Sequence, residues 1–322
     1  MVIGQRKGFL DKLRVLATCT VVFLHTLTGA VNNTAPAVFP NGEKSYLIIM
    51  DLICWCVPMF LMISGYIFLR PCWVPDMRIM ASRYCPRILL ALSIFGIPYA
   101  CIERIAAEKS FSLKTVGMGF LDVLRGRGLA HMWYLYVILI LYLITPLLHR
   151  LMHALPECIT FILIGVLFLG CSMFPGLAAI LPNVRNWLPV LPGWMVYFLY
   201  YIIGFVFSEY CCPDTAAENN GKKFTALRWF YLLALGATAT GMIVSRLAGF
   251  TLLMGYNYPL TVVLSTLIFG CAQSREQWFE KRRTQYKWQC DENTMNHRDK
   301  KTNDGKVPQS FASEFTSFIR CF

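Results

Sequence analysis

Residues 11–25, DKLRVLATCTVVFLH, begin a predicted membrane-spanning helix with an arginine at its start and a histidine eleven residues later. At 100° per residue, eleven residues make about three turns plus 20°, so Arg14 and His25 are expected on one helix face, roughly 16 Å apart along the axis. That spacing places His25 about halfway through a hydrocarbon core of about 30 Å. An ionisable side chain at that depth is costly, which indicates a functional site that faces protein or a wet cavity.

The whole chain has the composition of a protein that crosses a bilayer several times. Of its 322 residues, 56% are hydrophobic and 15% are charged, and its mean hydropathy is +0.51. Apolar runs of about 20 residues alternate with short polar gaps, which indicates an all-α transmembrane helical bundle and not a β-barrel. A net charge of +12 would suggest nucleic acid as the partner of a soluble protein. Here the basic residues cluster at the ends of apolar runs, so we expect a lipid bilayer and no nucleic acid.

The apolar runs predict eight spans, and the basic side chains between them predict an orientation. More Lys and Arg fall on the side that carries the N-terminus, the main exception being the long loop 104–130. Because cytoplasmic loops carry an excess of basic residues, we expect the N-terminus in the cytoplasm. The predicted spans are about 13–31, 46–69, 87–105, 131–149, 158–178, 190–208, 228–248 and 251–272.

The second predicted span contains polar and helix-breaking residues inside an apolar run. Pro58 removes a backbone hydrogen bond and is expected to kink the helix, while Gly65 lets another backbone approach closely. Asp51 falls near the outer end, where solvation explains a carboxylate. The segment that follows, RPCWVPDMRIMASRYCPRIL (70–89), is expected to be a compact basic loop that sets topology or holds anionic headgroups or a phosphorylated cofactor.

The last part of the chain differs in composition from the rest. Residues 273–322 are rich in charge and poor in aliphatic side chains, so we expect a largely disordered cytoplasmic tail after a transmembrane domain at 1–272. The thirteen cysteines include no CxxC pair and no Cys/His spacing suited to zinc. Neither a disulfide framework nor a metal site is indicated.

Three phrases in successive spans follow the pattern of a known family. Residues 11–25 carry aspartate, then leucine-arginine, a small residue, and a histidine ten intervening residues after the arginine. VPMFLMISGYIF (57–68) contains a Ser-Gly-Tyr phrase, and HMWYLYVILILYLITPLL (131–148) contains His-x-Trp-Tyr-Leu followed by Tyr and Pro. Together these phrases resemble acyltransferase family 3, the integral-membrane O-acyltransferases that modify bacterial cell-surface polysaccharides and other glycans. The resemblance covers about 8–272 and is nearest to the polysaccharide-modifying branch.

The resemblance implies an activity and a location. An acyl group, most often acetyl, would pass from a cytoplasmic acyl-CoA to a hydroxyl of a cell-surface or lipid-linked glycan. The enzyme would lie in the bacterial inner membrane with its N-terminus and tail in the cytoplasm. Acyl-CoA would be a donor substrate, with no cofactor bound permanently.

The chemistry of this reaction suggests roles for particular residues. A sugar hydroxyl is a poor nucleophile at neutral pH, so we expect His25 to act as a general base, since burial disfavours its charged form. Arg14, oriented by Asp11, would hold the CoA phosphates, and we expect Arg14 and His25 to face one polar chamber. The other predicted site residues are Arg87 and Arg83 for CoA, Ser64 and Tyr66 as an acyl relay or oxyanion donors, and His131, Trp133 and Tyr134 for the glycan.

Two departures from the family pattern keep other interpretations open. Arg83 and Arg87 are four residues apart, whereas the family often has two arginines three apart. The family usually has ten spans, and here only FASEFTSFIRCF (311–322) echoes the start of the ninth, so the last two spans are expected to be missing. The chain could then be an inactive truncated member. A multi-span solute transporter also combines buried polar residues with kinked helices.

Overall fold

The computed structural model describes residues 8–33, 42–71, 74–109, 111–126, 133–181, 187–210, 221–249 and 255–276. These residues form helices and short connections with no strand among them, which confirms the predicted all-α class. The predicted tail lies outside the described residues from position 277 onward. Six of the described helical stretches are long and apolar enough to cross a membrane, and they are Gly8–Ala30, Ser45–Phe68, Met77–Glu108, Trp133–Ala154, Glu157–Ala178 and Trp229–Leu247.

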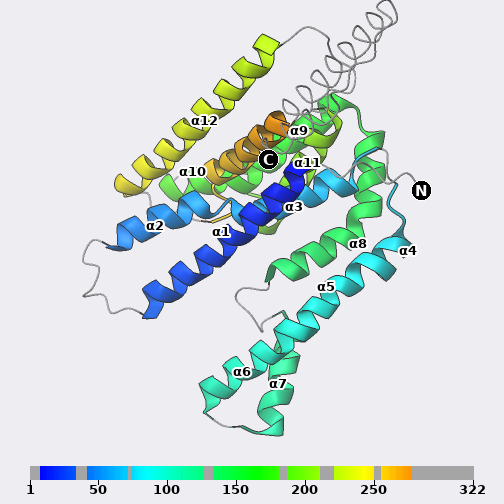
Figure 1. The fold of residues 1–322 in the computed structure, drawn as a ribbon, viewed down its shortest axis with the longest axis vertical. Helices are drawn as coiled ribbons and strands as arrows, with labels where there is room; N and C mark the ends of the chain where they lie inside the picture. The colour runs from blue at the N-terminus through cyan, green and yellow to red at the C-terminus, as the bar shows by residue number, and fades with distance from the viewer. Residues whose placement is uncertain are drawn as a thin grey trace, which may run out of the picture. The chain divides into compact units, whose positions relative to one another are not determined.

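The other two predicted spans also correspond to helices, but they are shorter. Gly193–Glu209 is apolar and contains a single 3₁₀ turn followed by α11 (Val196–Glu209). The last described helix occupies 259–276 and is orange in Figure 1. Three further predicted spans lie within several residues of the observed helices. They correspond to α8 (Trp133–Ala154), to α9 (Glu157–Phe168) with α10 (Phe174–Ile180), and to α12 (Gly221–Leu247).

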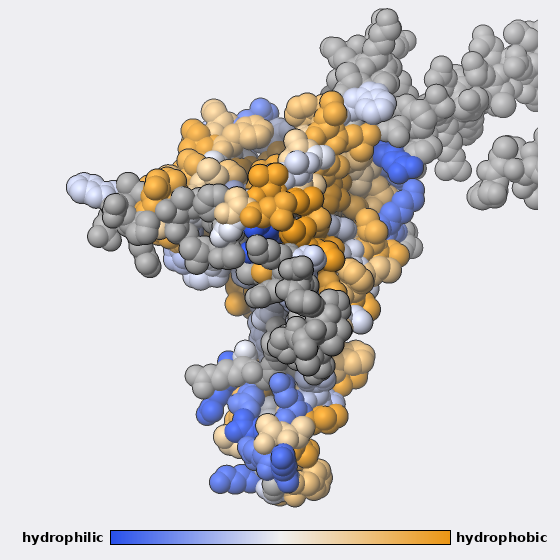
Figure 2. Space-filling view, turned by 90° about the vertical axis from the view of Figure 1, so that its left-hand side faces the viewer, coloured by the Kyte–Doolittle hydropathy of each residue, from blue (hydrophilic) through white to orange (hydrophobic). Residues whose placement is uncertain are grey.

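The first helix, α1 (Gly8–Asn33), separates its side chains onto two faces. Leu13, Ala17 and Leu24 are buried against the bundle, whereas Val15 and Val22 are more than half exposed. Spacings of four and seven residues between side chains in the same environment are those of a helix with one face toward protein and one toward lipid. Broad apolar areas of the kind that suit lipid are visible as orange side chains in Figure 2.

The predicted second span is broken, as expected from its proline. It consists of α2 (Gly42–Ile53) and α3 (Cys56–Phe68), with a turn at Cys54 and Trp55 between them. A proline ring collides with the carbonyl group four residues earlier, and for Pro58 that residue is Cys54. The break therefore falls where the collision would occur, and Pro58 itself lies in the first turn of α3, where no amide hydrogen is needed.

The third long helix begins earlier than the sequence predicts and continues through two prolines. The basic segment before it was expected to be a loop up to residue 89, but the structure is helical from Met77. Wider π-helical turns occur at Met80–Tyr84 and Leu92–Gly96, and each contains the residue four positions before a proline, Pro86 and Pro98. The wider turn gives the ring room, so the helix continues through both prolines.

The loop expected at 104–130 is partly a helical hairpin. Helix α6 (Ile97–Glu108) continues beyond the predicted end of the span, and α7 (Leu113–Leu124) packs back against it. Arg104 forms ion pairs with Glu108 and Asp122, which joins the two helices. Local ion pairs and the Ser112 cap thus stabilise helical structure in a segment whose second helix, at 12 residues, is too short to be a span.

Helices α3 and α11 cross with their backbones in contact. A Cβ atom added at Gly65 would overlap the Tyr201 carbonyl, and one added at Gly204 would overlap the Met62 carbonyl. The close approach predicted for Gly65 is confirmed. Both helices are buried along most of their length, and their side chains form the main core together with Phe9, Leu13 and Ala17 of α1.

Asp51 does not lie in solvent as its position suggested. It is 4% exposed and accepts two hydrogen bonds from Arg246 of α12, at 2.5 and 3.0 Å. Arg246 is 5% exposed. The carboxylate is buried because a charged partner from a distant span reaches it with a bidentate guanidinium, which offsets part of the cost of removing both groups from water.

Gly65→Ala and Gly204→Ala should each separate α3 from α11. Because the colliding atoms are backbone carbonyls that cannot turn aside, each variant should lose about 1–3 kcal/mol of stability or fail to fold. Thermal unfolding of detergent-purified protein measures this loss. Gly165→Ala is the matched control, since nothing lies within 4 Å of a Cβ added there. Equal melting temperatures for Gly65→Ala and Gly165→Ala would contradict the close crossing.

Removing one member of the Asp51–Arg246 pair should destabilise the protein by about 3–5 kcal/mol, because the remaining charge stays buried without an opposite charge beside it. Replacing both, as Asp51→Leu with Arg246→Met, should recover most of that loss. The same unfolding measurement on Asp51→Leu, Arg246→Met and the double variant tests this. Additive losses in the double variant would mean that the two side chains do not act as a pair.

Candidate active site

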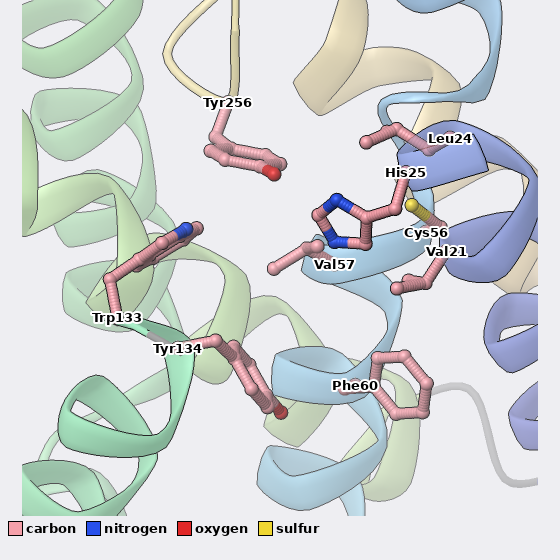
Figure 3. Close-up of a pocket in the computed structure, with 9 residues that line it drawn as sticks. All are labelled: Val21, Leu24, His25, Cys56, Val57, Phe60, Trp133, Tyr134 and Tyr256. Carbon is pink, nitrogen blue, oxygen red and sulfur yellow. The ribbon is translucent and has the colours of Figure 1, made fainter. Parts of the chain in front are cut away.

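His25 lies on a cavity of about 260 Å³ between α1, α3, α8 and the turn that precedes the last described helix. Figure 3 shows its imidazole extending from α1 into the space between these elements. We call this space the His25 cavity. Its lining residues are Val21, Leu24 and His25 of α1, Cys56, Val57 and Phe60 of α3, Trp133 and Tyr134 of α8, and Tyr256.

The walls of the His25 cavity differ in chemistry. Beside His25, the lining from α1 and the adjacent turn of α3 is mainly aliphatic. Across the cavity, Trp133 and Tyr256 lie with ring centres 5.2 Å apart and planes inclined at 45°. Aromatic rings with polar edges bind flat partly apolar ligands and donate hydrogen bonds at their rims. An uncharged imidazole opposite such a wall can take a proton from a ligand held between them.

Arg14 lies on a second cavity of about 290 Å³, which we call the Arg14 cavity. Its charged members are Arg14 and Arg87, and its lining is completed by Ser64, Ile67, Phe68, Tyr84, Ile88 and Tyr142. None of these eight residues is acidic, so the cavity has positive charge on its walls. The planar donor forks of two arginines suit a phosphate or carboxylate.

The predicted pairing of Asp11 with Arg14 is confirmed. Arg14 Nη1 donates to Asp11 Oδ1 at 3.2 Å, and the side chains of Arg14 and Asp11 are 45% and 33% exposed. At this exposure the pair contributes little to stability but restrains the direction of the guanidinium. Arg87 is restrained differently, with its guanidinium 5.9 Å from the centre of the Tyr84 ring.

The single chamber expected for Arg14 and His25 is not what the structure contains. The two cavities share no lining residue, although both are lined by α1, α3 and α8. They follow one another along the helices, since on α3 the His25 cavity ends at Phe60 and the Arg14 cavity begins one turn later at Ser64. Between them, Phe60 and Tyr134 have ring centres 6.0 Å apart. Helix geometry alone predicts one space, whereas the structure has two cavities with different lining residues, and both aromatic rings line the His25 cavity.

Tyr134 is the residue that connects the two cavities. It lines the His25 cavity, yet it interacts electrostatically with Arg14 and with Tyr142, which line the other cavity. Tyr142 in turn interacts with Ser64 and Arg14.

The other predicted site residues lie in different surroundings. Ser64 and Arg87 line the Arg14 cavity, and Trp133 lines the His25 cavity. Arg83 is exposed and lines neither of these cavities. Tyr66 is 2% exposed and packs edge-on against Phe9 in the core, away from both. His131 lies outside the described residues.

Sequence reasoning missed several residues of both cavities. Tyr142 could be predicted from the sequence, because it follows Tyr134 on the same helix and is a polar residue in the middle of a span. Tyr84 lies three residues before the predicted Arg87, on a segment that the sequence predicts as a loop. Tyr256 and Cys56 had no signal, because their proximity to His25 depends on how distant helices pack.

The fold and the two cavities define an integral-membrane helical protein that carries cationic and imidazole side chains inside its bundle. The family model described as an acyltransferase domain, that of acyltransferase family 3, matches residues 7–288. The chain belongs to this family and is a membrane acyltransferase. No curated protein and no solved structure matches the chain.

Proposed function

We propose that the protein transfers a short acyl group, acetyl in the simplest case, from a cytoplasmic acyl-CoA to a hydroxyl of a cell-surface or lipid-linked glycan. The location that fits is the bacterial inner membrane, with the N-terminus on the cytoplasmic side. One observation carries the proposal: a cavity with two arginines and a cavity with a histidine follow one another along the same three helices. The first suits the charged part of the donor and the second suits the reacting groups.

The Arg14 cavity would hold the phosphates of CoA. Arg14 and Arg87 reach it from different helices, so a phosphate between them receives charge-assisted hydrogen bonds from two sides. Asp11 keeps the Arg14 guanidinium oriented before the donor arrives, which lowers the entropy lost on binding. Arg83, exposed one turn before Arg87, would meet the part of CoA that stays outside the cavity.

His25 would act on the acceptor hydroxyl as a general base. The hydroxyl oxygen attacks the thioester carbon while its proton passes to the imidazole. The carbon–sulfur bond then breaks, an ester carbon–oxygen bond remains, and the proton leaves with the CoA sulfur as a thiol. General-base help of this kind is typically worth about 10²–10⁴ in rate.

The size of the His25 cavity supports a small acyl group. At about 260 Å³ it lies below the roughly 300–1,000 Å³ of most ligand pockets. A long fatty acyl chain would need more of this space than remains once an acceptor hydroxyl is beside His25. Acetyl is the smallest common donor group and leaves the most room.

Direct transfer is the simpler route for the acyl group. The thioester arm would pass Phe60 and Tyr134 to reach His25, since on α3 and α8 these are the lining residues of the His25 cavity nearest in sequence to Ser64 and Tyr142 of the Arg14 cavity. A relay through Ser64 does not remove that step, because Ser64 lines only the Arg14 cavity. Tyr66 is buried in the core away from both. We therefore favour an arm that separates the two rings and delivers the thioester to His25.

His25→Ala should reduce acyl transfer at least about 100-fold while leaving the protein in the membrane at normal abundance. Mass spectrometry of surface glycans from cells with wild-type or variant protein measures the loss of the acyl group. Thr26→Ala is the matched control, because Thr26 is exposed on the same helix and its hydroxyl donates to the Val22 carbonyl one turn earlier, its one hydrogen bond to the described part of the chain. Unchanged acylation in cells with His25→Ala would show that His25 is not the general base.

Arg14→Lys should weaken the use of acyl-CoA by about tenfold, since a lysine keeps the charge but loses the planar fork. The apparent affinity for acetyl-CoA in membranes, followed by release of the CoA thiol, measures this change. Arg78→Lys, at an exposed position that lines neither cavity, should behave as wild type. An unchanged affinity in Arg14→Lys membranes would exclude the phosphate role.

A further inference from the structure

Tyr256 is held in the His25 cavity by a turn that is anchored at three successive residues. The Tyr200 hydroxyl donates to the Tyr256 carbonyl at 2.7 Å. Asn257 Nδ2 donates to the Gly193 carbonyl at 3.1 Å. The hydroxyls of Tyr258 and Ser245 are 2.8 Å apart. Three different elements therefore restrain this turn, and the Tyr256 ring enters the cavity from a backbone that has little freedom.

The turn begins at a glycine that other residues would strain. Gly255 has φ +97°, in the left-handed region that favours glycine. This conformation starts the turn that carries Tyr256. A backbone restrained in this way costs less entropy when a ligand binds to the ring that it carries.

Tyr256 extends an aromatic surface that starts at Trp133. The Trp133 ring lies 5.2 Å from both the Tyr256 and the Tyr197 ring centres, with planes inclined at 45° and 34°. Trp133 and Tyr256 face the cavity, while Tyr197 packs behind Trp133 and does not line it. Figure 3 shows the two lining rings across the cavity from His25.

We propose that Trp133 and Tyr256 form a stacking platform for one pyranose ring of the acceptor, with a ring hydroxyl directed at His25. The inference rests on the proposed function and adds Tyr256 as a residue that determines which acceptor binds. A pyranose has a face of C–H groups that packs on an aromatic ring, and hydroxyls at its edge that need polar partners. The cavity has aromatic rings on one side and an imidazole on the other, which matches this division.

The acyl donor is the less suitable ligand for this platform. It would enter from the Arg14 cavity past Phe60 and Tyr134, and Tyr256 lines only the His25 cavity. The aliphatic side chains beside His25, such as Val21 and Val57, offer a closer match to an acyl methyl group. The aromatic platform is then left for the sugar.

Saturation-transfer-difference NMR on the detergent-purified full chain tests the platform. The probes are methyl β-D-glucopyranoside, methyl β-D-galactopyranoside and methyl N-acetyl-β-D-glucosaminide, with acetyl-CoA as the donor probe. At least one glycoside should receive saturation at its ring C–H protons from wild type and from Tyr256→Phe. Tyr256→Ala should weaken that binding by roughly tenfold, since it removes one of two stacking rings. Tyr99→Ala, which removes a half-exposed tyrosine of α6 that lines neither cavity, should bind as wild type.

The possible outcomes separate the platform from the proposed function. Glycoside binding that is equal in wild type and Tyr256→Ala, or absent from wild type for all three probes, overturns the platform. So does a signal at the acetyl methyl of acetyl-CoA that depends on Tyr256, because it would assign the rings to the donor. His25→Ala should keep glycoside binding while losing acyl transfer. If wild type binds a glycoside through Tyr256 but releases no CoA from acetyl-CoA, the platform stands and the transferase proposal fails.

Discussion

Helix α3 lines both cavities, and its position is set by backbone contact with α11. At Gly65 and Gly204 the two helices approach until a single added carbon would collide with a carbonyl group. Such a contact fixes the rotation of α3 as well as its distance, because turning the helix would bring larger neighbours into the crossing. Phe60 is thereby directed into the His25 cavity and Ser64 into the Arg14 cavity. Backbone approach through glycine is a common solution in membranes, where apolar burial alone does not drive helices together.

Prolines determine how the surrounding helices depart from regular geometry. Pro58 ends α2 and lets α3 begin in a new direction at Cys56. Pro86, Pro98 and Pro175 each follow a π-helical turn that contains the residue four positions earlier. In a bilayer, a broken helix must find other partners for its backbone groups, whereas a widened turn keeps most of them bonded. Arg87 reaches its cavity from a helix that stays continuous for this reason.

Residues close in sequence were predicted well, and residues joined by tertiary packing were not. Helical spacing predicts Arg14 and His25 on one face of α1, and the resemblance places Trp133 and Tyr134 with the site; all four line one of the two cavities. The burial of Asp51 could not be foreseen, because it depends on Arg246 from a span almost 200 residues later. The two cavities have different lining residues, and the contact of Phe60 with Tyr134 in the His25 cavity is one that no spacing rule includes. Tyr256 lines the His25 cavity from a turn that three other elements hold.

The central claim is that the donor binds along α1, with its phosphates at the arginines and its thioester at the histidine. A cryo-electron microscopy structure of the full chain with a non-hydrolysable thioether analogue of acetyl-CoA tests it most directly. The account predicts phosphate density within hydrogen-bond distance of Arg14 and Arg87, with the arm passing between Phe60 and Tyr134 so that the acetyl mimic lies beside His25. Density that places the phosphates away from both arginines, or the acetyl mimic away from His25, would contradict it.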